Sequence, residues 1–250
     1  MTAMSGDPPL SSDAFRHVPT LRDRVAAPDT SALRVTLQTL QVWDERARQD
    51  GRPHDWRLSE TELQASRQAM LAQREGADEL WIYSYGSLMW DPGFHFAEVR
   101  RADLQGHQRR FSFRPTLGRG SPEQPGLMLA LEPGAGCCQG LVYRVDQSLV
   151  DVESAIVWRR EMIRGSYRPA WVPVDTPQGT VTALAFGANR SHRDYVGELP
   201  LDQTARMIAW ASGFLGKNRA YLEQLAEQLG RLQIHDPYVL HLMEQVRGTG

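Results

Sequence analysis

Short apolar runs separated by turn residues dominate the chain from residue 80 to residue 186. Residues 80–84 are apolar and aromatic almost throughout, which is typical of a strand buried on both faces. Residues 109–114 alternate instead, and this places their two phenylalanines on one face of a strand. Further strands are predicted at residues 127–131, 140–145, 170–174 and 180–186. Pro173 lies within one of them, so that strand is expected at a sheet edge or with a bulge.

Helical periodicity precedes this region. An apolar stripe with helical spacing begins at Ser31 and stops at Gly51. A second helix starts at Ser59 and Glu62, which form a capping-box pair. That helix can run to residues 74–75, with Gly76 as its C-terminal cap.

Helices also interrupt and follow the strands. Ser148 with Asp151 predicts a helix start, and Val152 and Ile156 share one face of that helix. The last third is helical, with predicted helices at residues 201–215, at residues 218–229 and from Asp236 onward. Asp236 suits the N-cap position because Pro237 follows it at the first helical position.

The order of these elements predicts an α+β fold. The strands are too many and too short for a doubly wound sheet, which favours a compact, barrel-like sheet with flanking helices. Residues 1–30 lack apolar periodicity and are expected to form a mobile N-terminal tail. Residues 31–76 are then a helical extension, and residues 77–250 form the main domain.

Composition excludes several classes of protein. Of the 250 residues, 41% are hydrophobic and 23% are charged, as in ordinary globular proteins. The formal net charge of −2 gives no general attraction to nucleic acid or to an anionic membrane surface. No apolar run approaches the length of a membrane span, and there is no apolar signal region, so we expect a cytoplasmic protein.

The turn Tyr85-Gly86-Ser87-Leu88 directly follows the first strand. Gly86 allows a positive φ and a close approach of the backbone to a ligand. Successive N–H groups in such a turn can hold a carboxylate or phosphate. A turn that only connects two elements is the competing interpretation.

Conventional nucleophiles and metal ligands have little support. Ser87 lacks the Gly-x-Ser-x-Gly pattern because Met89 occupies the last position. Cys137 and Cys138 are adjacent, which suits neither a disulfide nor a zinc site, and each is expected to act as a small buried residue. The histidines show no metal-ligand spacing, so no metal is expected.

Charged candidates remain ambiguous from the residues alone. Arg114 and Arg119 follow a predicted strand and could hold an anionic substrate, or they could be solvated. Glu153 and Glu161 lie eight residues apart, about 80° apart on an ideal helix. Neither falls on the apolar stripe, so Glu161 is expected to be exposed unless the helix ends near Arg160 and the chain turns inward.

Several stretches taken in order resemble one known family. They are YGSLMW at 85–90, PGF at 92–94, GRGSPE at 118–123, PGL at 125–127, WRREM at 158–162, YVGEL at 195–199, GKNRAYL at 216–222 and IHD at 234–236. Together these stretches resemble the ChaC branch of the gamma-glutamylcyclotransferases, the glutathione-specific type. The resemblance covers roughly residues 80–246 and does not include residues 1–76.

The resemblance implies a fold, a reaction and a set of site residues. The implied fold is a small α+β domain with a barrel-like mixed sheet. The implied reaction splits glutathione into 5-oxoproline and cysteinylglycine without metal or cofactor. Glu161 matches the catalytic glutamate of the family, and the turn of residues 85–88 matches its substrate cradle. Tyr195 matches a tyrosine beside the bound gamma-glutamyl group, whereas Arg114 and Arg119 fit less closely.

The residue types suit this chemistry. In a gamma-glutamyl amide, the attacking α-amine and the attacked carbonyl belong to one molecule, so no enzyme nucleophile is needed. Folding the substrate is a proximity effect. Glu161 can take a proton from the amine and return it to the leaving nitrogen, and burial would raise its pKa toward neutrality. The N–H groups of the turn can hold the α-carboxylate and offset charge on the carbonyl oxygen.

Two alternatives stay open at this point. The same cyclisation could act on another gamma-glutamyl amide or amino acid. The chain could also be a non-catalytic module that binds a gamma-glutamyl ligand or a protein partner through its N-terminal helices. Glu161 argues against the second alternative, because a pure binder needs no carboxylate beside the scissile bond.

Overall fold

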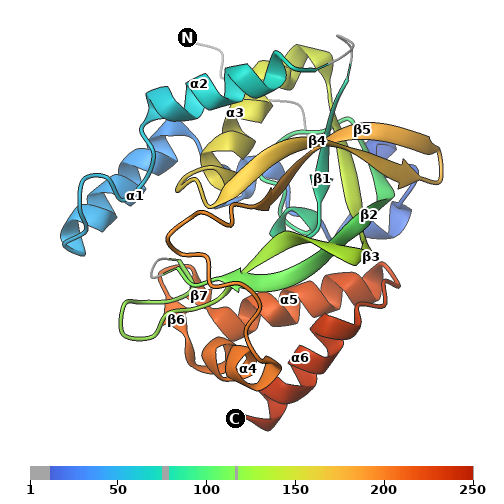
Figure 1. Cartoon of the computed structure of the whole chain (residues 1–250). Coiled ribbons are helices and arrows are strands. Elements are labelled where there is room, and N and C mark those ends of the chain that lie inside the picture. Colours follow the sequence, from blue (N-terminus) through green and yellow to red (C-terminus); the bar gives the residue numbers. More distant parts are fainter. Residues whose placement is uncertain (1–11, 75–78, 116–117, 250) are drawn as a thin grey trace.

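The structure is a computed structural model that describes residues 12–74, 79–115 and 118–249. Its centre is a closed barrel of five strands in the order β1-β3-β2-β4-β5 (Figure 1). The strands are β1 (Leu80–Ser84), β2 (Glu98–Phe113), β3 (Met128–Val145), β4 (Tyr167–Thr176) and β5 (Gly179–Ala188). Most pairs are antiparallel, and β1 runs parallel to β5 where the barrel closes. The predicted α+β class with a barrel-like mixed sheet is confirmed.

β1 is buried over its whole length because it has a partner strand on each side. It pairs with β3 along all its residues and with β5 at Trp81 and Ile82. Aromatic rings fill the space beside it, and Phe96 and Tyr143 lie with their ring centroids 4.7 Å apart. Burying one large apolar side chain stabilises a fold by about 1.5–3 kcal/mol. The apolar run at residues 80–84 therefore predicts this strand correctly.

β2 and β3 are longer than the apolar runs that predict them. β3 joins the predicted strands at residues 127–131 and 140–145 through a polar, glycine-containing segment that pairs with β2. The register of this ladder shifts between Gln105 and His107, where Gly106 has a φ of 70°. Such a bulge needs a positive φ, which glycine adopts without strain. Backbone pairing keeps the segment in the sheet, so its side-chain pattern could not reveal it.

β4 is nearly an edge strand, as Pro173 predicts. It pairs with β5 along its whole length but meets β2 only at Asp175, opposite Asp103. A proline has no N–H to donate, and a strand with one weakly paired side tolerates it.

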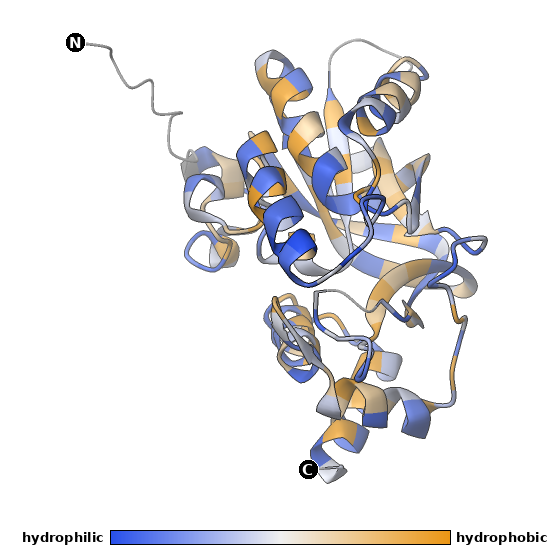
Figure 2. Cartoon of the chain, turned by 90° about the vertical axis from the view of Figure 1, so that its left-hand side faces the viewer, coloured by the Kyte–Doolittle hydropathy of each residue, from blue (hydrophilic) through white to orange (hydrophobic). Residues whose placement is uncertain are grey.

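The helices are α1 (Leu37–Gln49), α2 (Glu60–Leu71), α3 (Val150–Glu161), α4 (Leu201–Trp210), α5 (Asn218–Arg231) and α6 (Pro237–Gly248). Figure 1 shows α2 lying against α3 on one side of the barrel, while α4, α5 and α6 form a layer on another side. Hydrophobic and hydrophilic segments alternate along the helices in Figure 2, as in helices with one buried face. Within the residues that the structure describes, no helix is both long and apolar enough to cross a membrane.

The two N-terminal helices are shorter than the sequence predicts. α1 begins at Leu37 rather than Ser31, because Thr36 and Thr39 form a capping box. The predicted capping box of α2 is present, with Ser59 Oγ accepting from the Glu62 N–H at 3.2 Å. α2 ends at Leu71, and the predicted cap Gly76 lies outside the described residues.

Two later helix boundaries also differ from the prediction. α3 begins at Val150, and Asp146 rather than Ser148 accepts the capping bond at the turn before it. Val152 is 55% exposed and does not share the buried face of Ile156. The helix predicted at residues 201–215 ends at Trp210, and the chain then forms a small ribbon of β6 (Ser212–Gly213) and β7 (Gly216–Lys217). α6 begins as predicted, capped by Asp236.

Residues 12–30 pack against the barrel and do not form the mobile tail that the sequence predicts. They contain three short 3-10 turns, at Ser12–Phe15, Pro19–Leu21 and Pro28–Thr30. Phe15 is 3% exposed and meets Phe96 edge-on, with ring centroids 5.6 Å apart. The buried residues here follow no helical or strand period, so hydrophobic periodicity could not reveal them. Residues 1–11 lie outside the described part of the chain.

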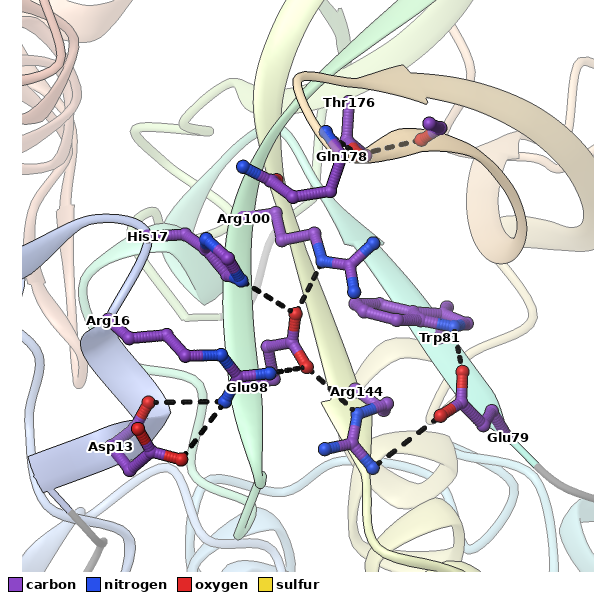
Figure 3. A network of polar contacts seen from close by, with 11 residues as sticks. Asp13, Arg16, His17, Glu79, Trp81, Glu98, Arg100, Arg144, Thr176 and Gln178 are labelled. Carbon is purple, nitrogen blue, oxygen red and sulfur yellow. Dashed lines mark hydrogen bonds and ion pairs between the residues drawn. The ribbon is translucent and has the colours of Figure 1, made fainter.

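A buried carboxylate holds this segment to β2 (Figure 3). Glu98 is 2% exposed and is paired with Arg16 and with His17 from the N-terminal segment. Arg100 and Arg144 bind the same carboxylate from the barrel. Burial raises the pKa of Glu98, but Arg100, Arg16 and Arg144 outweigh it and hold that pKa below its ordinary value. Glu98 is therefore charged at neutral pH, and the network anchors residues 12–17.

Candidate active site

Glu161 is the last residue of α3, and its side chain is 13% exposed. The last helical bond of α3 runs from the Met162 N–H to Trp158 O at 2.8 Å. Arg160 Nε lies 3.3 Å from Glu161 Oε1. Burial raises the pKa of Glu161 above its ordinary value, and the charge of Arg160 opposes that shift only in part. The expectation of an exposed Glu161 is therefore wrong, and the condition for an inward turn is met.

Three tyrosines lie close enough to Glu161 for its charge to raise their pKa values, although burial is the largest cause for each. Tyr85 follows β1 and donates to Phe186 O at 2.9 Å. Tyr167 lies on β4 and donates to Leu129 O at 2.9 Å. Tyr221 lies on α5, and its pKa is raised to about 12. All three hydroxyls therefore stay protonated at neutral pH and can donate hydrogen bonds.

The turn of residues 85–88 lies directly against Tyr221. Gly86 has a φ of −133°, so the expected positive φ is wrong. Its role is close approach, because a Cβ at this position would lie 3.0 Å from Tyr221 Oη and 3.3 Å from Leu129 Cδ2. Leu88 is 6% exposed and packs in the hydrophobic core, so its side chain helps to anchor the turn.

Arg160 connects this turn to α3. Its Nη2 donates to Ser87 Oγ at 2.9 Å, and its Nη1 donates to the carbonyl of Asp91 at 2.6 Å. A guanidinium cannot accept a proton, so it cannot activate Ser87 as a nucleophile. The geometry thus supports the prediction that Ser87 is not a nucleophile, and it places a positive charge between the turn and Glu161.

Arg119 lies over the outer side of Tyr221. Its guanidinium carbon is 5.2 Å from the centre of that ring, and its Nη1 donates to Lys217 O at 3.0 Å. Burial lowers the pKa of Arg119, and Tyr221 opposes that shift. Asn218 holds the end of the same loop through both backbone groups of Leu127, at 2.7 and 2.9 Å. The loop is therefore fastened to α5, the helix that carries Tyr221.

Two predicted site residues do not join this group. Arg114 is exposed, and its backbone N–H bonds to Asp194 O at 2.8 Å. Tyr195 packs against Phe113, with ring centroids 5.5 Å apart, and Phe113 also packs against Tyr167, at 5.8 Å. The structure thus gathers Tyr85, Gly86, Ser87, Leu88, Glu161 and Arg119. Tyr195 is connected to this group through Phe113 and Tyr167, and Arg114 is exposed.

Other candidate chemistry is weak in the described residues. Cys137 is exposed and Cys138 is buried, and burial raises the pKa of both thiols, which disfavours the reactive thiolate. No group of three or more potential metal ligands occurs in that part of the chain. Cavities of about 580 and 670 Å³ lie along the N-terminal helices, and Glu161 lines neither.

The barrel and the residues around Glu161 lie within the part of the chain that matches one protein family. The sequence model of the family described as ChaC-like protein matches residues 80–249. The chain belongs to the ChaC-like protein family. The resemblance inferred from the ordered motifs is confirmed, and the N-terminal segment before residue 80 lies outside the match.

Similar proteins include named relatives of this ChaC-like chain. The glutathione-specific gamma-glutamylcyclotransferase of Escherichia coli (strain K12) is 40% identical over 184 residues, which is 73% of this chain and 79% of that protein. The glutathione-specific gamma-glutamylcyclotransferase 1 of Homo sapiens is 34% identical over 173 residues, 67% of this chain and 78% of its own length. The crystal structure of a yeast gamma-glutamyl cyclotransferase specific to glutathione has a TM-score of 0.63 at 22% identity, covering 69% of this chain and 97% of that chain. This structural likeness supports the fold.

Sequence reasoning missed several residues of the ChaC-like site. Arg160 and Tyr221 lie inside the matching motifs, so the motifs themselves were the available signal. Tyr167 lies outside every motif, and no pattern marked it. Arg109 is 2% exposed and donates from Nε to Tyr85 O at 2.7 Å, while its Nη1 lies 3.1 Å from Asp236 Oδ2. It fixes the backbone of the turn. The alternation at residues 109–114 places Arg109 on the same strand face as Phe111 and Phe113, so that pattern was the available signal for its burial.

Proposed function

We propose that this ChaC-like protein is a glutathione-specific gamma-glutamylcyclotransferase that converts glutathione to 5-oxoproline and cysteinylglycine. The single observation that carries the proposal is the placement of Glu161. It is a mostly buried carboxyl group with a raised pKa, held beside the turn of residues 85–88 by Arg160. The names of the E. coli and human relatives supply the substrate.

The proposed reaction needs only a proton carrier. The α-amine nitrogen of the substrate attacks its own γ-carbonyl carbon, and a new C–N bond closes the five-membered ring. The original amide C–N bond breaks, and the proton lost by the amine moves through Glu161 to the leaving nitrogen. A carboxyl group whose pKa lies above the ordinary range is better matched to both transfers near neutral pH. Holding the amine near the carbonyl supplies the remaining acceleration.

Binding is assigned to the turn and its two cationic neighbours. The N–H groups of residues 85–88 are proposed to hold the α-carboxylate, with Arg160 adding positive charge at Ser87. Arg119 is proposed to attract the second carboxylate of glutathione, because it lies over Tyr221 and no carboxylate pairs with it among the described residues. Tyr221 is proposed to donate to the γ-carbonyl oxygen, where negative charge develops. Arg114 and Tyr195 remain weaker proposals, since Arg114 is exposed and Tyr195 reaches the group around Glu161 indirectly, through Phe113.

Turnover of glutathione by the purified protein tests this proposal. We expect release of 5-oxoproline and cysteinylglycine in equal amounts, followed by chromatography. The gamma-glutamyl dipeptide lacking glycine, and gamma-glutamyl amino acids, serve as competing substrates in the same assay. Faster turnover of one of these compounds than of glutathione would show that this compound is the preferred substrate and would overturn the glutathione specificity. Tight binding of glutathione without product would indicate the non-catalytic alternative and overturn the proposal.

We also propose that the protein works in the cytoplasm. The support is that both cysteines are free, and that Cys137 is an exposed thiol, which suits a reducing compartment. Fractionation of cells that produce the protein, followed by detection with an antibody, would test this. Recovery from an oxidising compartment would contradict it.

A further inference from the structure

The N-terminal helices contact α3 on both sides of Glu161. Before Glu161, Arg159 Nη2 donates to Glu60 Oε1 of α2 at 2.7 Å, and the Arg159 side chain is 11% exposed. After Glu161, the Leu58 N–H donates to Ile163 O at 2.8 Å. Carbonyl groups beyond a helix end have no intrahelical partner, and here a residue before α2 supplies one. The backbone of Glu161 is thus held from outside the family match.

The segment that makes these contacts is itself held in place. Asp44 of α1 accepts hydrogen bonds from Trp56 Nε1 at 2.9 Å and from Arg57 Nη2 at 2.6 Å. Arg57 Nη1 in turn donates to Leu58 O at 2.8 Å. The loop between α1 and α2 is therefore fixed to α1, and it presents the Leu58 N–H to Ile163. Because both the N–H and the carbonyl of Leu58 are hydrogen-bonded, Leu58 holds the chain at the end of α3 in place.

The N-terminal extension also contacts the β6–β7 ribbon. Trp43 of α1 packs edge-on against Phe214 of the β6–β7 ribbon, with ring centroids 6.1 Å apart. The ribbon is tied to the loop of Arg119, since the Leu215 N–H donates to Gly118 O at 2.9 Å. One continuous element therefore touches the helix that carries Glu161 and the ribbon beside Arg119.

We propose that residues 31–74 form a positioning element that sets the location of the Glu161 carboxyl group through Glu60 and Leu58. The effect of this element on catalysis rests on the proposed cyclotransferase function. Under this proposal, the predicted helical extension and the predicted catalytic domain work together as one unit. Neither Glu60 nor Leu58 touches the reacting atoms in this scheme. They act by fixing the end of α3, because a shift of about 1 Å in a catalytic group can cost up to 100-fold in rate.

Glu60→Gln is the test variant, and Glu45→Gln is its matched control. Glu45 lies on the same extension and also pairs with an arginine, Arg48, but both are exposed and within α1. We expect Glu60→Gln to lower kcat on glutathione about tenfold with KM changed less than about twofold. The control should match the wild type in both constants. The double variant Glu60→Arg/Arg159→Glu should recover most of the lost kcat, because it restores the ion pair with reversed charges.

The pKa of Glu161 gives a second readout that needs no turnover. Among the residues that the structure describes, the charged or titratable groups that face it are Arg160, Tyr85, Tyr167 and Tyr221, and Glu60→Gln changes none of them. Loosening the end of α3 should admit water and lower the Glu161 pKa, measured by carbon NMR with Glu161→Gln to assign the signal. An unchanged pKa, with kcat equal to the control, would overturn the positioning role even if Glu60→Gln lowers Tm. An inactive wild type would refute only the cyclotransferase function, and the titration would still decide the positioning.

Discussion

The two ends of α3 carry the same residue type in opposite settings. At the N-terminal end, Glu153 is 1% exposed and accepts hydrogen bonds from Nη1 and Nη2 of Arg34, at 2.7 and 2.9 Å. The His95 N–H adds a third bond at 3.0 Å. At the C-terminal end, the one cationic contact of Glu161 in the described part of the chain is Arg160 at 3.3 Å. Its charge raises the pKa of three buried tyrosines nearby.

This difference separates an acid that holds the fold from an acid that can move a proton. The Glu153 carboxylate accepts three hydrogen bonds from Arg34 and His95, which joins the N-terminal segment to α3. A carboxyl group that burial makes costly to ionise can exchange protons near neutral pH. The helix thus uses one glutamate to attach Arg34 of the extension and presents the other to the proposed substrate.

Glu161→Gln gives the largest expected effect on this comparison. Glutamine keeps the size and polarity of the side chain but cannot accept the amine proton. We expect kcat on glutathione to fall by about 10²- to 10⁴-fold, the usual contribution of a general acid–base group. The circular dichroism spectrum and the Tm should not fall. A variant with wild-type kcat would show that another group carries the proton.

Glu153→Gln should produce the opposite result. The substitution removes the carboxylate that accepts from both terminal nitrogens of Arg34 in a mostly buried position, so we expect the free energy of unfolding to drop by about 2–3 kcal/mol. The site lies about 12 Å away along the helix axis, so kcat of the folded variant should stay within about threefold of wild type. Urea titration and turnover at low temperature measure the two quantities. A large loss of kcat without loss of stability would contradict the division of roles.

The sequence predicts the outline of this comparison but not its decisive geometry. Capping residues predict the starts of α2 and α6, and the apolar run at residues 80–84 predicts β1, because these signals are local. The burial of Glu161 depends on where α3 ends. That point is set by tertiary contacts such as Leu58 to Ile163, more than 100 residues apart in the chain, which no helical periodicity contains.

Spatial neighbours also differ from sequence neighbours at the site. Arg114 lies next to a strand end close in sequence to Arg119, yet the first is exposed and the second stacks on Tyr221. The middle of β3 is polar, and it is a strand because its backbone pairs with β2. Residues 12–30 are buried through scattered apolar contacts and the ion pairs of Glu98. In each case the deciding partner comes from another element.

Tyr221→Phe tests whether the tyrosines around Glu161 do more than exclude water. Phenylalanine keeps the ring that supports Arg119 and removes only the hydroxyl next to Gly86. We expect kcat to fall about 10- to 100-fold if the hydroxyl donates to the developing charge on the carbonyl oxygen. Tyr238→Phe is a suitable control, since its hydroxyl accepts from the Phe111 N–H and has no contact with Glu161. Equal kcat values for the two variants would show that the Tyr221 hydroxyl does not contribute to catalysis and that the ring only packs.

The smallest expected effect is a pH-dependent difference in stability between wild type and Glu161→Gln. The folded state raises the pKa of Glu161 above the ordinary value of 4.5, so folding favours the protonated carboxyl group. Below pH 4.5 the group is protonated in both states, and it contributes no pH dependence. As the pH rises through the folded pKa, the unfolded chain has already released its proton, and wild-type stability falls. Glutamine has no proton to release, so the variant should gain stability relative to wild type across this window and keep that gain at higher pH. Urea unfolding at a series of pH values measures the gap. A gap that narrows as the pH rises would show that the fold stabilises Glu161 as an anion.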